Sequence, residues 1–451
     1  MRTTPTTLLK TLPECLDGET PVAVRLIDIE QGTAGLRLPA NAGGSLHHRL
    51  VALVRRDGLP LGWTALEVSA DGTVSLDGLA AAGELAAGPH EAPGGLPIAR
   101  GGPHEAPGGL PGAPGASPYA PGGSPGASGG PPDAPAGLLS VVVTTCANVE
   151  QVISCVEAIR ACGDEALEIV VVENRPVLST LERTLEERFG GDRLVHYVEE
   201  HRRGLSRARN AGLGAARGDI VAFTDDDIVV DRAWVRALRT AFVRSPSVDC
   251  VTGLILPFEL ETPTQVLAER FASFGKGFSQ RTYTLEDPPL DQPLFPYTAG
   301  YFGSGANMAF RTAVIRDLGG FDPALGAGTR TRGGEDLDIC IRLLRAGRRL
   351  AYEPGAIVWH RHPNTLARLR QQVLGYGIGL GAMLTKQIIV GPDRWSIVSR
   401  APQGIRYFMD PGSRKNAARG AVFPRSLSRL ERIGVAYGPF AYMAGCLGRS
   451  R

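Results

Sequence analysis

The sequence predicts an α/β protein built around a doubly wound, mostly parallel sheet. Between Leu138 and Asp227, strand-like apolar runs alternate with helical patterns at the spacing of β–α–β units. The strand-like runs cover 138–148, 166–174, 194–200 and 219–227, and the helical patterns cover 149–162, 178–189 and 205–216. Polar side chains follow these apolar runs, and the ligands of such sheets bind beyond the carboxyl ends of the strands.

Composition places the chain among soluble globular proteins. It has 451 residues, enough for two or more domains, with 43% hydrophobic and 21% charged residues. The net charge is only +2, so no nucleic-acid partner is expected. Seven scattered cysteines show neither zinc-ligand spacing nor a Cys-x-x-Cys pair, which is typical of free thiols in a reducing cytoplasm.

No targeting or spanning segment is expected. The N-terminal residues lack the apolar core and the cleavage site of a signal peptide. The most apolar stretch, Val373–Val390, is interrupted by four glycines and by Lys386 and Gln387, which argues against a membrane-spanning helix. We therefore predict a cytoplasmic protein.

Four segments follow from the patterning. Residues 1–81 show short strand-like runs at 22–29, 50–56, 63–70 and 74–76, with turns at 57–62 and 71–72, and form a small β-rich module. Residues 82–137 form a disordered linker: 22 of the 37 residues from Gly101 to Gly137 are Gly or Pro, and GPHEAPGGLP occurs at both 88–97 and 102–111. Residues 138–362 form the main domain. Residues 363–451 form a helical, basic extension with 14 Lys/Arg against 3 Asp/Glu.

The main domain carries three consecutive carboxylates at the end of an apolar run. Asp225, Asp226 and Asp227 directly follow the strand-like residues 220–224. Three anions at a buried strand end repel one another and raise one another's pKa unless a cation lies among them. A hard divalent cation that shares oxygen ligands with a phosphate suits this position, and a solvated acidic turn is the alternative.

These motifs, in this order, resemble the family 2 glycosyltransferases over Leu138–Pro363, in an actinobacterial type with an extra N-terminal β-rich module. The resemblance implies the GT-A fold and a nucleoside-diphosphate sugar as donor. It implies that the first two strand ends hold the nucleoside; the matching residues are Thr145, Asn148, Glu173 and Asn174. The family usually has an Asp where Glu173 stands.

The segment HRRGLSRARNAGLGAARGD resembles the Gly-rich loop and helix of the family. Gly204 permits close backbone approach, and arginines next to a helix N-terminus suit phosphate oxygens. Arg207 and Arg209 are two positions apart and cannot both face one ligand, so one of them is a surface or structural residue; Arg207 is our candidate ligand. Asn210 contacts the donor or hydrogen-bonds within the fold.

The resemblance gives the three aspartates the role of the family's DxD motif. It implies that Asp227 ligates Mg²⁺ or Mn²⁺ most directly and that Asp225 reaches the ribose or the ion. Asp226 is grouped with the residues that bind the nucleotide-sugar, although we expect its side chain to point away. His360, with His362 as second choice, completes the metal shell; a structural role for both is the alternative.

The acceptor side is implied by two further motifs. In YFGSGANMAFRTAVI, Gly305 permits tight packing next to the sugar, and Asn307 binds donor or acceptor or caps a strand end. In GGEDLD, Asp336 is implied as the general base of a single inverting displacement. Glu335 then binds acceptor hydroxyls and is the alternative base, and Asp338 starts the helix.

The extension has two interpretations. Residues 365–389 form a plain helix pair packed on the domain, or they lie on an anionic membrane with Arg368, Arg370 and Lys386 facing the headgroups. The membrane interpretation places the enzyme at the inner face of the plasma membrane, near a lipid-linked acceptor.

Together these observations predict an inverting, metal-dependent glycosyltransferase with a hydroxyl acceptor: a polysaccharide or cell-envelope glycan, a lipid-linked sugar or a small molecule. A nucleotidyltransferase would need a basic Gly-rich loop after the first strand, but residues 144–151, TTCANVEQ, contain no basic residue. A non-catalytic sugar-binding module would not need Asp225, Asp227 and Asp336 together. A dinucleotide-binding dehydrogenase would need G-x-G-x-x-G at the first turn, which is absent.

Overall fold

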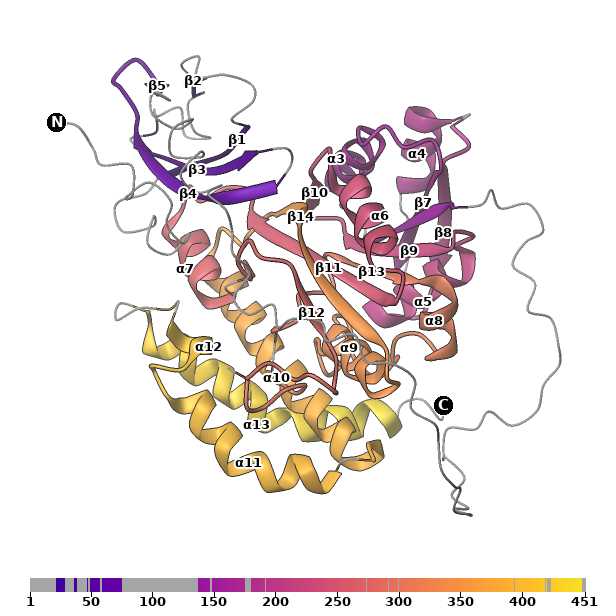
Figure 1. The fold of residues 1–451 in the computed structure, drawn as a ribbon, viewed down its shortest axis with the longest axis vertical. Coiled ribbons are helices and arrows are strands. Elements are labelled where there is room, and N and C mark those ends of the chain that lie inside the picture. Colours follow the sequence, from indigo (N-terminus) through magenta and orange to yellow (C-terminus); the bar gives the residue numbers. More distant parts are fainter. Residues whose placement is uncertain are drawn as a thin grey trace, which may run out of the picture.

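A nine-stranded mixed sheet forms the centre of the computed structural model (Figure 1). The model describes residues 22–28, 36–38, 47, 49–56, 59–74, 137–146, 148–174, 180–190, 192–272, 274–290, 292–298, 300–392, 394–417, 419 and 423–447. The predicted linker, with His90 and His104, lies outside these residues except for its last position, Gly137. The sheet strands are β6 (Leu139–Thr145), β7 (Leu167–Asn174), β8 (Val195–Glu200), β9 (Ile220–Asp225), β10 (Ile228–Val230), β11 (Val248–Pro257), β12 (Arg281–Tyr283), β13 (Met308–Arg311) and β14 (Arg349–His360).

The strand order confirms the predicted mostly parallel, doubly wound sheet. The order is β10-β14-β11-β13-β9-β6-β7-β8, with β12 also paired to β14. Six of the nine strands run in one direction, and β10, β12 and β13 oppose them. The helices of the main domain are α3 (Val149–Arg160), α4 (Leu181–Phe189), α5 (Leu205–Ala215), α6 (Trp234–Arg244), α7 (Pro263–Ala272), α8 (Thr312–Asp317) and α9 (Glu335–Arg345).

Helices cover both faces of the sheet because its central strands are apolar on both sides. Every residue of β6 is buried. Val141 belongs to the core cluster that includes residues of α3, α4 and α6, whereas Val142 belongs to the cluster that includes residues of α5. Alternate residues of one strand thus serve two layers, as a doubly wound sheet requires. The six described cysteines are free, as predicted for thiols in a reducing compartment.

The N-terminal module is a small sheet packed on the main domain. Its strands are β1 (Val22–Asp28), β2 (Leu36–Arg37), β3 (Arg49–Arg56), β4 (Leu59–Glu67) and β5 (Thr73–Val74), with β1-β3-β4 in one sheet and β2 paired to β5. The turn predicted at 57–62 is shorter than expected, because β4 already begins at Leu59. Arg55 forms an ion pair with Asp231 at 2.8 Å, and Trp63 joins the core of the main domain.

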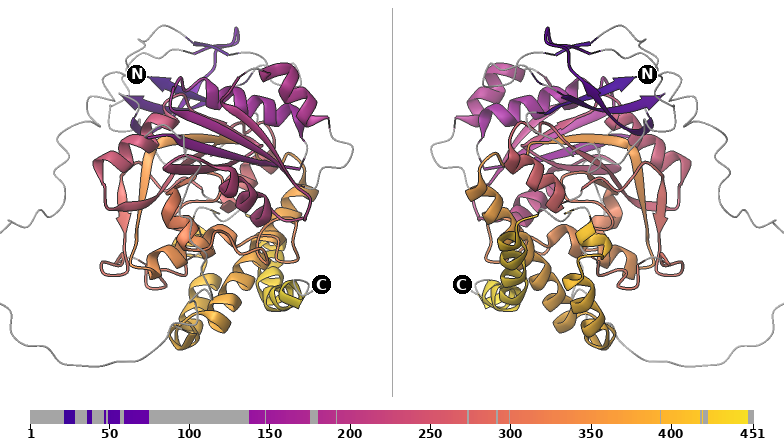
Figure 2. Two further views of the ribbon diagram at one scale, coloured as in Figure 1. Left: turned by 90° about the vertical axis from the view of Figure 1, so that its right-hand side faces the viewer. Right: turned by 90° about the vertical axis from the view of Figure 1, so that its left-hand side faces the viewer.

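The C-terminal extension is helical, as predicted. It contains α10 (Leu366–Val390), α11 (Arg394–Met409), α12 (Arg414–Ala417) and α13 (Arg425–Leu447). Figures 1 and 2 show that it lies at the end of the molecule opposite the N-terminal strands. The helix pair expected at 365–389 is instead one continuous helix.

Helix α10 contains several glycines although glycine weakens an isolated helix. Close packing against neighbouring backbone accounts for them. A Cβ at Gly377 or Gly381 would collide with the backbone of α13, and a Cβ at Gly379 would collide with the loop at Gly333. These glycines therefore mark close backbone contacts on two sides of the helix. By length and composition α10 could cross a membrane, with mean hydropathy 1.4 over an 18-residue window, but 56% of that window is buried inside the protein.

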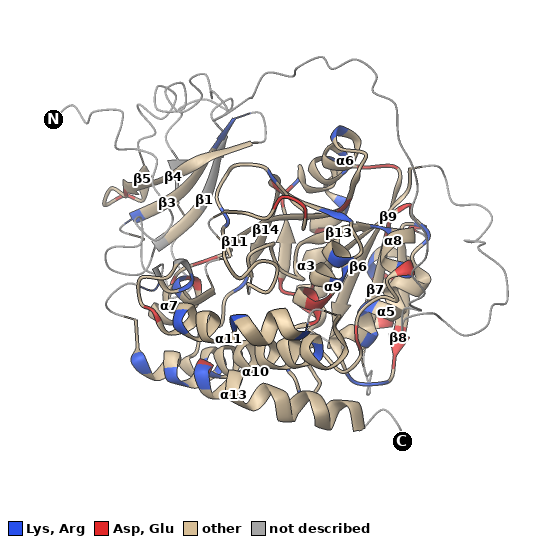
Figure 3. Ribbon diagram, turned by 60° about the horizontal axis from the view of Figure 1, so that its bottom comes forward, with Lys and Arg blue, Asp and Glu red and all other residues tan. Residues whose placement is uncertain are grey.

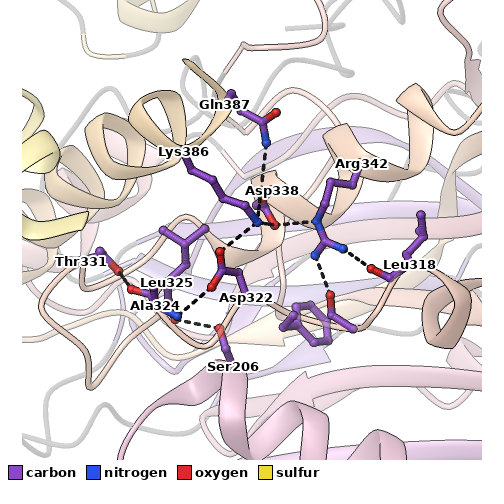
Figure 4. Close-up of polar contacts among 12 residues, drawn as sticks. Ser206, Leu318, Asp322, Ala324, Leu325, Thr331, Asp338, Arg342, Lys386 and Gln387 are labelled. Atoms are coloured by element: carbon purple, nitrogen blue, oxygen red, sulfur yellow. Dashed lines mark hydrogen bonds and ion pairs between the residues drawn. The ribbon is translucent and has the colours of Figure 1, made fainter. Parts of the chain in front are cut away.

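A buried ionic cluster ties α10 to α9 (Figure 4). Asp338 is fully buried and accepts hydrogen bonds from Lys386 at 2.8 Å, Gln387 at 3.0 Å and Arg342 at 2.8 Å. Lys386 also pairs with Asp322 at 3.0 Å. The prediction that Lys386 faces lipid headgroups is therefore wrong: a buried ammonium needs carboxylate partners, and it has two.

We expect Lys386→Ala to destabilise the fold by about 3 kcal/mol, because it removes the cation that the buried carboxylates of Asp338 and Asp322 share. Urea unfolding followed by tryptophan fluorescence measures this loss. Arg370→Ala removes an exposed cation from the same helix and is the matched control, with an expected change within about 0.5 kcal/mol. Equal effects of the two substitutions would show that the cluster does not hold α10 in place.

Candidate active site

A cavity of about 1280 Å³ opens at the carboxyl ends of the parallel strands. The end of β6, the Asp225–Asp227 turn and the start of α9 line one part of it, and the 300–306 loop, the end of α7 with residues 274–277, and the extension line other parts. Of the predicted site residues, nine line the cavity: Thr145, Asn174, Asp225, Asp226, Asp227, Gly305, Glu335, Asp336 and His360.

Parallel pairing of β6 with β9 sets the position of the aspartates. Thr144 lies beside Asp225 in register, and its hydroxyl donates to that carboxylate at 3.2 Å. The Thr145 hydroxyl donates to Asp226 at 2.5 Å. Asp226 therefore faces the cavity, which corrects the expectation that it points away; its neighbour on β6 supplies a donor that draws it inward.

The pKa shifts at the Asp225–Asp227 turn agree with the repulsion between carboxylates that the sequence predicts. Burial, together with the neighbouring Asp227 and Asp225, raises the pKa of Asp226 to about 7. Burial alone would raise the pKa of Asp227, but the His360 imidazole at 3.4 Å outweighs it, and the pKa of Asp227 falls. For His360 the two effects have the opposite signs. Burial lowers its pKa, the Asp227 carboxylate raises it, and the pKa of His360 is raised overall. The turn thus gathers negative charge that a cation would stabilise.

A buried arginine that we did not choose from the sequence lies at the centre of the site. Arg209 is 1% exposed and donates to Asp225 at 3.0 Å and to Glu335 at 3.0 Å. Arg207 does not line the cavity. The helix period contains the missing signal, because Arg209 is four residues before the buried Leu213 and so shares the inward face of α5.

The two acidic residues at the start of α9 are held differently. Gly334 has φ +89°, a left-handed conformation that begins the helix and aims both side chains toward the cavity. Glu335 is buried against Arg209, and burial together with Asp336 raises its pKa to about 7. Asp336 accepts a hydrogen bond from the Gly305 amide at 3.0 Å and remains partly accessible.

Gly305 is constrained by this arrangement. A Cβ at this position would press on the Arg209 guanidinium. Glycine is therefore required for the 300–306 loop to reach Asp336 while Arg209 keeps its two carboxylates. This packing reason differs from contact with the sugar, which was the reason expected from the sequence.

Two predicted ligands have structural roles instead. Asn148 is the N-cap of α3, and its side chain accepts from the Gln151 amide. Asn210 both donates to and accepts from the backbone of Phe321, each at 2.8 Å. Neither side chain lines the cavity, so the structure corrects their assignment to the nucleotide-sugar.

Asn307 is a third correction. It is fully buried, its amide donates to the carbonyls of Leu254 and Ala356, and its oxygen accepts from the Trp234 indole. Every polar atom of the side chain is occupied, and it does not line the cavity. The structural alternative recognised in the sequence is the one the structure adopts.

At the carboxyl end of β7, side chains predicted to bind the nucleoside form hydrogen bonds within the protein. Asn174 lines the cavity, but its side chain accepts from the Gly204 amide at 2.9 Å and donates to two carbonyls of the preceding loop. It thereby fixes Gly204, which has φ +137°. Glu173 is buried, and one of its carboxylate oxygens accepts from Tyr197 at 2.7 Å, while the other has no hydrogen-bond partner.

The residues at the turn suit a divalent cation that is shared with a ligand. Among the described residues, no three His, Cys, Asp or Glu side chains are grouped closely enough to hold a metal by themselves. Asp227 and His360 lie together on the cavity wall, and Nδ1 of His360 is buried without a partner. Mg²⁺ and similar ions are commonly held by one or two protein ligands plus substrate phosphates, so this donor set fits. His362 instead contacts Glu269 at 2.8 Å.

The far end of the cavity comes from the extension, which the sequence did not indicate. Lys415 and Arg419 both pair with the buried Glu431, at 2.5 Å and 2.9 Å. Arg419 also stacks over the ring of Phe271, 4.7 Å from its centroid. The contact of Arg419 with Phe271 joins residues 148 positions apart, so no local pattern could have revealed it.

A carboxylate-lined cavity at the carboxyl edge of a doubly wound sheet defines an α/β enzyme that handles charged ligands. The chain belongs to the family described as "Glycosyltransferase like family 2", whose model matches residues 135–374. The predicted family is thereby confirmed, and so is the predicted GT-A fold class.

Relatives share parts of this domain. The chain is 35% identical to the pre-mycofactocin glycosyltransferase of Mycobacterium tuberculosis over 167 residues, which are 37% of this chain and 32% of that protein. It is 25% identical to the glucosyl-dolichyl phosphate glucuronosyltransferase of Haloferax volcanii over 212 residues, 46% of this chain and 63% of that one. The matches thus span about a third to under two thirds of these relatives.

Solved structures show similarity at low identity. One is a mannosyltransferase from Pyrobaculum calidifontis in complex with GDP-Man and Mn²⁺, 18% identical, with TM-score 0.41, covering 68% of this chain and 86% of that one. Another is glucosyl-3-phosphoglycerate synthase from Mycobacterium tuberculosis in complex with Mn²⁺, UDP and phosphoglyceric acid, 18% identical, with TM-score 0.38, covering 56% and 78%.

We expect transfer activity to rise as the pH increases through about 7, because Glu335 must lose its proton to hold Arg209 as an ion pair. Glu335→Gln is neutral at every pH. It should remove this acid limb and lower the rate at pH 8 by roughly tenfold, since a hydrogen bond to a charged group contributes about 1.5–3 kcal/mol. The measurement is a pH–rate profile at saturating metal. An unchanged limb in the variant would assign the ionisation to another group.

Proposed function

We propose that the protein is an inverting glycosyltransferase that uses a nucleoside-diphosphate sugar and a divalent cation. The observation that carries the proposal is that Asp225, Asp227 and Asp336 all line one cavity. Arg209 links β9, which ends at Asp225, to α9, which carries Asp336. A metal-binding end and a candidate base thus face the same space. The two Mn²⁺ complexes among similar structures agree with this chemistry.

The donor binds at the carboxyl ends of β6 and β9 in this proposal. Asp227 and His360 would hold Mn²⁺ or Mg²⁺, which would supply positive charge next to the diphosphate. The Thr145 hydroxyl, Asp225 and Asp226 lie next to this position and contact the nucleotide. Gly204 itself does not line the cavity, but it holds the turn between Arg203 and Leu205, which do.

Asp336 is the better candidate base of the two acids on α9. Glu335 is committed to Arg209 and is 5% exposed, whereas Asp336 is partly accessible to the cavity. A base must reach the hydroxyl proton that it removes. A single displacement, with Asp336 accepting that proton, gives inversion at the anomeric carbon.

The acceptor is a hydroxyl on a glycan, a lipid-linked sugar or a small molecule, and the enzyme works in the cytoplasm. Peripheral contact with the inner face of the plasma membrane is part of this proposal. The large cavity leaves room for an acceptor beyond the donor, on the side lined by the extension.

Asp227→Ala should weaken binding of the nucleotide-sugar by at least about tenfold in the presence of Mn²⁺, because Asp227 would hold the cation that attracts the diphosphate. Calorimetry with a panel of nucleotide-sugars measures the effect. Glu187→Gln, which changes an exposed carboxylate on α4, is the control and should bind like the wild type. The catalytic proposal fails if no donor binds the wild type better than Asp227→Ala.

Asp336→Asn should retain donor binding within about twofold while transfer falls by roughly 10²–10⁴, the usual contribution of a general base. The asparagine oxygen can still accept from the Gly305 amide, so the loop stays in place. Product formation and donor affinity are measured on the same preparation. A variant that still transfers at the wild-type rate would move the base to Glu335 or elsewhere.

A further inference from the structure

The outer face of α13 is an uninterrupted apolar stripe. Ile433, Tyr437, Phe440, Met443 and Leu447 follow one another at helical spacing, and all are exposed; Phe440 is 68% and Leu447 76% exposed. The opposite face packs on α10 through Gly434 and Gly438. The exposed stripe therefore belongs to a firmly held helix rather than to a frayed end.

Helix α11 carries a second stripe. Trp395, Val398, Ile405 and Met409 recur at spacings of three, seven and four residues, which place them on one side of a helix. Trp395 is 76% and Ile405 66% exposed, and Ile397 is the one buried residue of this 16-residue helix. Figures 1 and 2 show α11 and α13 in the outermost layer of the extension, at the same end of the molecule.

The charges beside both stripes are nearly all positive. Arg394 and Arg406 are exposed on α11, and Arg425, Arg429 and Arg432 are exposed at the start of α13. Figure 3 shows this layer in tan and blue, with the second half of α13 free of charge. Among the described residues of the two helices the sole acid is Glu431, which is buried and paired; Asp410 follows α11 as an exposed acid.

We propose that the outer faces of α11 and α13 form a docking surface for an anionic lipid bilayer. Apolar side chains at helical spacing, a tryptophan and flanking arginines are the composition of a helix that lies in the membrane interface. Charge complementarity selects the occupant: a surface of arginines without exposed partners on the same helices matches anionic headgroups. A second copy of this chain would bring arginine against arginine.

Docking of α11 and α13 on a bilayer also bears on the class of acceptor. This conclusion about the acceptor rests on the proposed function, whereas the docking surface does not. Tyr407 of α11 and Glu431 of α13 line the cavity, so the helices that contact lipid also form its wall. An acceptor anchored in the bilayer then reaches the active site from the lipid side. The acceptor class is a lipid-linked hydroxyl compound.

The test is co-sedimentation of the full chain with vesicles of phosphatidylcholine alone or with 30% phosphatidylglycerol. We expect binding to the anionic vesicles that weakens at high salt. Replacing Arg425, Arg429 and Arg432 with Gln should weaken it by about a hundredfold, because each arginine near an anionic surface contributes about 1 kcal/mol, or roughly fivefold. The paired substitution Arg183→Gln/Arg188→Gln, on exposed positions of α4, should leave binding unchanged.

The apolar stripe is tested with Phe440→Glu/Leu447→Glu, for which we expect at least tenfold weaker binding. Val243→Glu, at a residue of α6 that is 78% exposed, is the matched control. Donor binding by each variant shows that it is folded, and it separates failure of docking from failure of the proposed function. Absence of wild-type binding, or equal binding of the stripe variant and Val243→Glu, overturns the proposal. A wild-type dimer that Phe440→Glu/Leu447→Glu converts to a monomer would assign the face to self-association.

Discussion

The geometry of the active site depends on one buried guanidinium. Arg209 reaches from α5 to Asp225 at the end of β9 and to Glu335 at the start of α9, and the ring of Phe321 lies 5.6 Å below it. A cation in this position must be paired, because an uncompensated charge in the interior costs several kcal/mol. The arginine therefore fixes the distance between the Asp225–Asp227 turn and the helix that carries the candidate base. These two elements are more than a hundred residues apart in the sequence, and no strand pairs them directly.

The extension stabilises the same helix from the other side. Lys386 and Gln387 on α10 contact Asp338, which follows Glu335 and Asp336 within the first turn of α9, while Gly379 packs against the loop that precedes α9. Helix α9 is thus held between Arg209 and α10. The family match also continues to residue 374, into α10. The extension supplies part of the active-site wall and cannot be regarded as a separate appendage.

The sequence predicts the parts of this site that follow from local periodicity. Continuous apolar runs identify the central strands, and the three aspartates mark the strand end where charge gathers. It fails where the partner of a side chain is distant. Three asparagines have a side chain that suits ligand binding, yet each hydrogen-bonds backbone groups instead: Asn148, Asn210 and Asn307. An asparagine side chain is as suitable for capping a helix or strand as for binding a ligand. Lys386 resembles a surface lysine in a Gly-rich helix until Asp338, 48 residues earlier in the chain, is placed beside it.

Backbone contact through glycine also bears on how the docking surface relates to catalysis. Gly377 and Gly381 of α10 meet Gly434 and Gly438 of α13 with no side chain between them, so the two helices cannot repack by changing rotamers. Gly379 continues this rigid contact to the loop before Glu335. A bilayer that holds α13 therefore holds the orientation of α9 and of the cavity as well. The N-terminal sheet lies at the opposite end of the molecule and faces away from such a membrane (Figure 2). The chain thus separates the surface that would meet lipid from the surface that remains open to other contacts.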